Sequence, residues 1–134
     1  MKDMGEPKIK IVAMPSDTNP AGNIFGGWIM SQIDLAGAIA AKEMAPERVV
    51  TISMKEVVFN EPVFVGDIVS CYAKVISVGK TSITTLVKVV VQRLTDHNTT
   101  ICVPVTTAEV VYVSVNKAGE KKPIDTDLKR LHGF

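Results

Sequence analysis

The chain has 134 residues, enough for one domain with one hydrophobic core and too few for a second catalytic domain. Its 15 lysines and arginines nearly balance 14 acidic residues, and a net charge of +1 argues against nucleic acid or an anionic membrane as a partner. The two cysteines can form neither a disulfide framework nor a zinc ligand set. We therefore expect a single domain over residues 1–134 that holds no metal.

The N-terminal part predicts one strand and a long loop. Residues 1–10 are polar and lack the apolar segment of a secretory signal, so we expect a cytoplasmic protein. Residues 8–14 form a short apolar run that Pro15 ends, and residues 16–23 supply turn residues one after another.

Residues 25–44 predict a helix that is apolar on almost every side. Ser31, Gln32 and Asp34 lie near its centre and oppose insertion into a membrane, so we expect a buried core helix that other elements must cover.

Only strand signals follow, in residues 49–59, 67–78, 81–94 and 100–115, which are rich in Val, Ile and Thr. Strands of this length imply a strongly curved antiparallel sheet. The fold class is therefore α+β, with one long central helix wrapped by the sheet. Residues 120–134 are charged, and we expect a loosely attached polar tail there.

Asp34 is a residue whose presence the apolar pattern of the helix does not explain. Burying a carboxylate without partners costs several kcal/mol. Either Asp34 accepts hydrogen bonds from neighbouring hydroxyls or amides, or it points to solvent at an interface, or it takes part in chemistry. The residues alone leave these alternatives open.

The loop and helix DTNPAGNIFGGWIMSQID, the hairpin SVGKTSI and the order of elements together resemble the hotdog-fold acyl-CoA thioesterases, specifically their bacterial YciA-like branch. The resemblance covers roughly residues 9 to 124. It implies a hotdog fold and an enzyme that hydrolyses acyl-CoA to free CoA and a carboxylic acid. It implies no separate cofactor, because coenzyme A is part of the substrate and product.

The resemblance also implies roles for residues of the helix and of the loop before it. Asp34 would act as general base or as nucleophile, and the sequence does not separate these routes. The Gly27 amide would bind the oxyanion, with the Gly26 amide as its rival, although both glycines could simply permit a tight entry into the helix. Asn23 would orient the attacking water or the thioester carbonyl; the alternative is that Asn23 only caps the helix.

Self-association follows from the same resemblance. Two subunits would pair their sheets edge to edge, with Asn23 of one chain across from Asp34 of the other. An unpaired Val-rich edge strand would also invite aggregation, which favours pairing. We expect a dimer, and a hexamer built as a trimer of dimers.

Lys80, Thr81 and Ser82 offer a cation and two hydroxyls, and in the resembling family this hairpin contacts the nucleotide end of coenzyme A. The alternative is an ordinary turn between two strands. The rival function is a non-enzymatic acyl-CoA-binding sensor, which would need the glycines and the hairpin but not Asp34. A hotdog dehydratase is disfavoured, because His97 and His132 lie in a late turn and in the tail.

Overall fold

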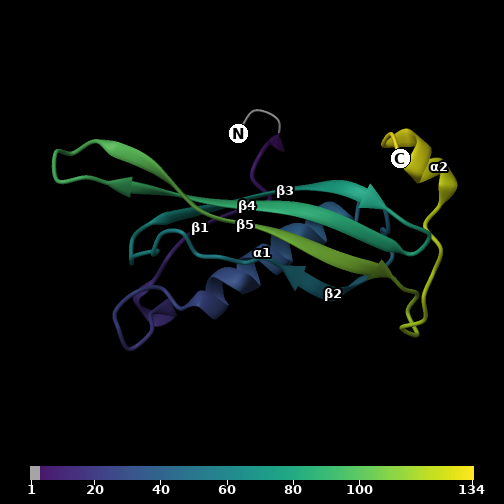
Figure 1. Cartoon of the computed structure of the whole chain (residues 1–134), viewed down its shortest axis with the longest axis horizontal. Helices are drawn as coiled ribbons and strands as arrows, with labels where there is room; N and C mark the ends of the chain where they lie inside the picture. Colours follow the sequence, from purple (N-terminus) through teal and green to yellow (C-terminus); the bar gives the residue numbers. More distant parts are fainter. Residues whose placement is uncertain (1–3) are drawn as a thin grey trace.

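The computed structural model describes residues 4–134, and its elements follow the predicted order of strand, helix and four strands (Figure 1). A short 3-10 helix, η2, and a C-terminal helix, α2, are additional. The elements are β1 (Ile9–Val12), η2 (Pro15–Asp17), α1 (Gly26–Ala41), β2 (Val49–Lys55), β3 (Ile68–Val78), β4 (Ser82–Leu94), β5 (Thr100–Ser114) and α2 (Thr126–Leu131).

The five strands form one antiparallel sheet in the order β1-β3-β4-β5-β2. Helix α1 lies along one face of this sheet and contacts every strand (Figure 1). The ladders shift register between Thr51 and Ser53, between Val75 and Ser77, and between Val89 and Val90. Such irregularities bend strands, which accounts for the curvature that strands of up to 15 residues require.

The core lies between α1 and the inner face of the sheet. Alternate residues of the long strands, such as Val87 of β4 and Val110 of β5, point toward the helix and are fully buried. The helix buries seven of its 16 residues: Ile29, Gln32, Ile33, Ala36, Gly37, Ala40 and Ala41.

The opposite side of α1 is not covered by the sheet of the same chain. Gly27, Met30, Ser31, Leu35 and Ile39 are exposed there at the spacing of one helical stripe. This stripe is apolar apart from Ser31 and Asp34, which is half-buried. No helix in residues 4–134 is long and apolar enough to cross a membrane.

Residues 120–134 are attached more closely than the sequence suggests. The amide of Lys122 donates to the carbonyl of Ser114, and the amide of Ile124 donates to the carbonyl of Lys80. Ile124 belongs to the buried core, and Leu128 of α2 packs against it. The segment therefore lies against the β3–β4 hairpin instead of extending freely.

A buried ion pair fixes the loop that precedes β3. Arg93 on β4 donates to both carboxylate oxygens of Asp67, at 3.0 and 2.7 Å, and to the carbonyl of Pro62 at 3.0 Å. Its guanidinium also lies over the Phe64 ring. The hydrogen bond to Asp67 is the main cause that raises the pKa of Arg93. These contacts thus attach the loop from residue 62 to residue 67 to β4, the central strand of the sheet.

Replacing Arg93 by Ala leaves the Asp67 carboxylate, which is 3% exposed, without its cation. We expect Arg93→Ala to lower the free energy of unfolding by about 3 kcal/mol, because an uncompensated buried charge is costly. The matched control is Lys122→Ala, which breaks the more exposed Lys122–Glu47 pair and costs less than about 1 kcal/mol. Urea denaturation at one protein concentration measures both, and equal losses would contradict the account.

Candidate active site

Asp34 lies in the middle of α1 and is held by two hydroxyl groups from the sheet. Thr51 on β2 donates its hydroxyl to Asp34 Oδ1 at 2.7 Å. The Tyr112 hydroxyl on β5 lies 2.6 Å from the main-chain carbonyl oxygen of Asp34 and 3.2 Å from Oδ1. Within residues 4–134, Oδ2 accepts no hydrogen bond and no cation forms an ion pair with Asp34. One carboxylate oxygen is therefore fixed, while the other is free to accept a proton.

The two donors are neighbours because of the strand register. Thr51 pairs directly with Tyr112 across the β2–β5 ladder, so both side chains reach the same point on the helix. The register shift at Ile52 begins immediately after Thr51, and such bulges often lie next to sites where a side chain must be aimed.

Burial keeps Tyr112 a donor. Desolvation raises the pKa of the Tyr112 hydroxyl far above its usual value, and the nearby charge and hydrogen bond of Asp34 raise it further. The raised pKa favours the protonated phenol, which is the form that donates a hydrogen bond.

Gly26 and Gly27 begin α1, and their amides donate no hydrogen bond to any described residue. Free amides at a helix N-terminus favour negative charge. A pocket of about 410 Å³ lies beside them, lined by Ser16, Asp17, Thr18, Phe25, Gly27, Trp28 and Ser31. Of the two glycines, Gly27 lines this pocket, so its amide is the free donor at the pocket wall.

Gly27 and Asp34 share the uncovered stripe of α1. Seven residues separate them, which is close to two helical turns, or about 10 Å along the axis. The structure of one chain therefore places both on the same side of the helix, but Asp34 does not line the pocket at Gly27.

Asn23 does not cap α1, so that alternative is wrong. The N-cap residue is Phe25, and no side chain caps the helix. The main chain of Asn23 bonds to Asn19, whereas its side-chain amide has no hydrogen-bond partner among the described residues. The structure does not bring the Asn23 side chain into hydrogen-bond contact with Asp34 of the same chain.

Lys80 and Thr81 lie in the β3–β4 turn, and Ser82 is the first residue of β4. Ile83, the residue after Ser82, pairs with Tyr112 on β5, so the turn lies close to the residues that hold Asp34. Lys80 is exposed, while the Ser82 hydroxyl lies against Gly79. Within residues 4–134, Lys80 forms no ion pair, so its charge is available to a ligand.

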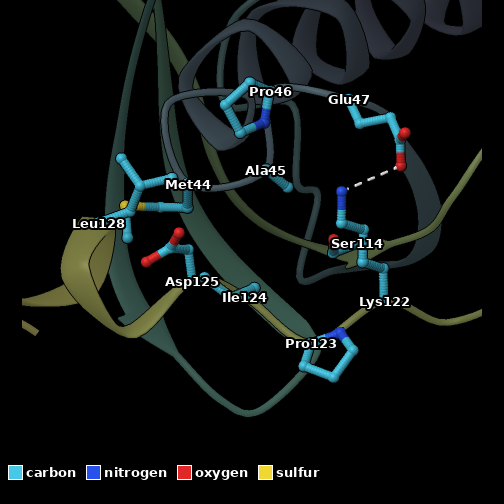
Figure 2. Close-up of a pocket in the computed structure, with 10 residues that line it drawn as sticks. All are labelled: Met44, Ala45, Pro46, Glu47, Ser114, Lys122, Pro123, Ile124, Asp125 and Leu128. Carbon is cyan, nitrogen blue, oxygen red and sulfur yellow. Dashed lines mark hydrogen bonds and ion pairs between the residues drawn. The ribbon is translucent and has the colours of Figure 1, made fainter.

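A second pocket, of about 350 Å³, lies between the end of α1 and the C-terminal segment (Figure 2). Lys122 and Glu47 form an ion pair at 3.2 Å at its rim, and Met44, Ala45, Ile124 and Leu128 give it apolar walls. Neither Asp34 nor Gly27 lines this pocket. It is therefore separate from the residues described above.

Sequence reasoning missed Thr51 and Tyr112. The alternation of β5, in which Ala108, Val110 and Tyr112 point inward, was the available signal for Tyr112. No local signal in the sequence pairs Tyr112 with Thr51, because that pairing depends on a register set between distant strands.

Comparison with known proteins places this site in a family. The model of the thioesterase superfamily matches residues 21–96, more than half of the chain. The acyl-CoA thioester hydrolase YciA of Salmonella typhimurium is 43% identical over 120 residues, which cover 90% of each chain.

Two solved structures are also similar over nearly the whole chain. A hexameric hotdog fold thioesterase of Campylobacter jejuni is 69% identical with a TM-score of 0.96, covering 98% of this chain and 99% of that one. HI0827, a hexameric broad specificity acyl-coenzyme A thioesterase crystallised as an aspartate-to-alanine mutant, is 39% identical with a TM-score of 0.87, covering 96% of both chains. The chain has the hotdog fold and belongs to the thioesterase superfamily.

Proposed function

We propose that this protein is an acyl-CoA thioester hydrolase in which Asp34 is the general base or nucleophile. The observation that carries the proposal is the state of the Asp34 carboxylate: Thr51 and Tyr112 hold Oδ1, and no side chain or main-chain group of residues 4–134 bonds Oδ2. The activity named for relatives that are about 40% identical over most of the chain supports it.

The chemistry needs few groups. In the general-base route, a water oxygen attacks the thioester carbon while Oδ2 of Asp34 takes a proton from that water. In the nucleophilic route, the carboxylate attacks the carbon and forms a mixed anhydride, which water then hydrolyses. In both routes the carbon–sulfur bond breaks, and the thiol, whose pKa is about 8 to 9, leaves with little acid assistance.

The oxyanion belongs at the start of α1 in this proposal. The free Gly27 amide, beside the 410 Å³ pocket, is the donor that we assign, and the Gly26 amide is its rival. No metal or separate cofactor takes part in the proposed reaction, since the base, the oxyanion donor and water account for every bond that changes.

A complete site is proposed to require a second copy of the chain. The exposed stripe of α1 continues onto the free edge of β2. Leu35 of the stripe is 55% exposed, and Ile52 of β2 is 59% exposed. Covering these side chains favours pairing of two β2 edges. Asn23 of the partner subunit would then reach Asp34 and orient the water or the carbonyl.

Higher assembly and location are extensions of the same proposal. The similar solved structures are described as hexameric, which supports a hexamer, and we propose a trimer of dimers that acts in the cytoplasm. In this proposal a dimer is enough to complete each site, and the hexamer adds no residue to it.

The nucleotide end of coenzyme A is assigned to the β3–β4 turn. Lys80 is exposed there and provides a charge for a phosphate, with Thr81 and Ser82 as neighbouring hydroxyls. An acyl-CoA-binding sensor would use the same turn, so binding alone does not separate the two functions.

The first test is CoA release, followed with a thiol-reactive chromogen, over acyl-CoAs from acetyl to palmitoyl. We expect wild-type turnover and a loss of at least about a hundredfold in kcat for Asp34→Asn, because the amide cannot accept the proton. Binding of CoA is expected to persist in the variant.

The outcomes divide the candidate functions. Binding of acyl-CoA without release by the wild type would favour the sensor. Turnover that survives in Asp34→Asn would show that another group supplies the base.

Gly27→Ala tests the oxyanion assignment. An added Cβ would lie 2.6 Å from Phe25 Cε1, the far end of a side chain that is 56% exposed and has room to turn away. We expect the fold to persist and kcat to fall by about a hundredfold, since the methyl group and the displaced ring crowd the free amide.

The matched variant is Gly26→Ala, whose Cβ would lie 3.4 Å from Phe59. A smaller loss of kcat is expected there, with thermal melts reported for both. A larger loss in Gly26→Ala than in Gly27→Ala would move the oxyanion to the Gly26 amide.

A further inference from the structure

We propose that Tyr112 is a positioning residue for Asp34, and that its hydroxyl fixes the carboxylate against the sheet in the orientation that the reaction needs. The inference rests on the proposed catalytic role of Asp34. It assigns a function to the hydroxyl of this core tyrosine, which packing of the fold does not require.

The contact joins one hydroxyl to two acceptors of the same residue. Tyr112 is fully buried, and its oxygen lies 2.6 Å from the main-chain oxygen of Asp34 and 3.2 Å from Oδ1. The hydroxyl has one proton to donate, so the two acceptors share it or take it in turn. Whichever acceptor it bonds, it holds Asp34 against the sheet.

Packing alone does not explain the hydroxyl. A phenylalanine ring would fill nearly the same volume between α1 and β5, and burying a hydroxyl is unfavourable unless it is hydrogen-bonded. The partner that satisfies this hydroxyl is Asp34, the half-buried carboxylate at the centre of the proposed site.

The helix leaves space for the hydroxyl at one position. Gly37 lies one turn after Asp34, and a Cβ there would collide with the Tyr112 oxygen and lie 2.9 Å from Thr85 Oγ1. Glycine is unfavourable inside a helix, so its presence here indicates a need for close approach. Gly37 therefore leaves the space that the Tyr112 hydroxyl occupies where it contacts Asp34.

The exchange of acceptors fits the proton transfer. When Asp34 is ionised, Oδ1 is the stronger acceptor, and donation from Tyr112 stabilises the charge. When Oδ2 has taken the proton from water, the tyrosine proton can bond the main-chain oxygen instead. Thr51 is the other described donor to the carboxylate, and Tyr112 is the titratable side chain that contacts it.

The test compares Tyr112→Phe with the control Tyr72→Phe. Tyr72 is half-buried on β3 and has no side-chain hydrogen bond among the described residues, while its neighbours Cys71 and Ala73 point into the core. Both variants lose one phenol oxygen, but only Tyr112→Phe removes a donor from Asp34.

We expect kcat of Tyr112→Phe to fall about tenfold with KM changed far less, as loss of a hydrogen bond to a charged group predicts. This split between kcat and KM is the readout that a purely structural loss would not reproduce. Tyr72→Phe is expected to keep the wild-type kcat and KM.

Gly37→Ala provides a second route to the same change, since its methyl group displaces the hydroxyl without removing it. The same fall in kcat with KM nearly unchanged supports the inference, with a thermal melt to establish that each variant is folded. Wild-type kcat in folded Tyr112→Phe would overturn it, and so would an equal fall in kcat in Tyr72→Phe.

Asp34→Asn in the same assay separates this inference from the proposed function. If that variant loses turnover while Tyr112→Phe behaves like Tyr72→Phe, Asp34 remains catalytic and the role of Tyr112 is wrong. If Asp34→Asn keeps its turnover, the proposed function fails and the role of Tyr112 fails with it.

Discussion

A carboxylate in the middle of an apolar helix has to be hydrogen-bonded, and the arrangement around Asp34 meets that constraint with two hydroxyls from the sheet. Because Thr51 and Tyr112 are directly paired across β2 and β5, the register of that ladder fixes the position of the carboxylate. Gly37 contributes by having no side chain where the tyrosine hydroxyl lies. The acid is thus hydrogen-bonded on one oxygen, while the other has no partner within residues 4–134.

The remaining parts of the site are tied to the same sheet. The amide of Ile24, beside Asn23, donates to the carbonyl of Val63, in the loop that the Arg93–Asp67 pair attaches to β4. The segment that leads into α1, and with it the position of the glycine amides, is therefore anchored by contacts from outside the helix. What one chain does not provide is a cover for the exposed stripe of α1 and for the free edge of β2, and this incompleteness is the physical argument for a second copy.

The sequence allowed the helix and the four strands after it to be predicted, and it singled out Asp34, because each leaves a local pattern. An apolar helix with one acid stands out, and runs rich in Val, Ile and Thr favour strands. Thr51 and Tyr112 were missed since their pairing joins positions 61 residues apart in sequence, which no local pattern encodes. The tail was misjudged for a similar reason: its charged residues surround Ile124, whose burial depends on the distant β3–β4 hairpin. The sequence left a helix cap open as the alternative role of Asn23, because asparagine is a good capping residue, but the helix begins only at Gly26.

The central claim is that two chains share each site around Asp34, and subunit mixing tests it most directly. Asn23→Ala and Asp34→Ala chains, each nearly inactive alone, are co-expressed with different tags and purified together. In a mixed dimer one site carries both substitutions and the other carries neither, so random pairing predicts recovery of about a quarter of the wild-type activity. Activity that stays at the level of the single variants, after both tags are detected in the same assembly, would contradict the account and place both residues in one chain's own site.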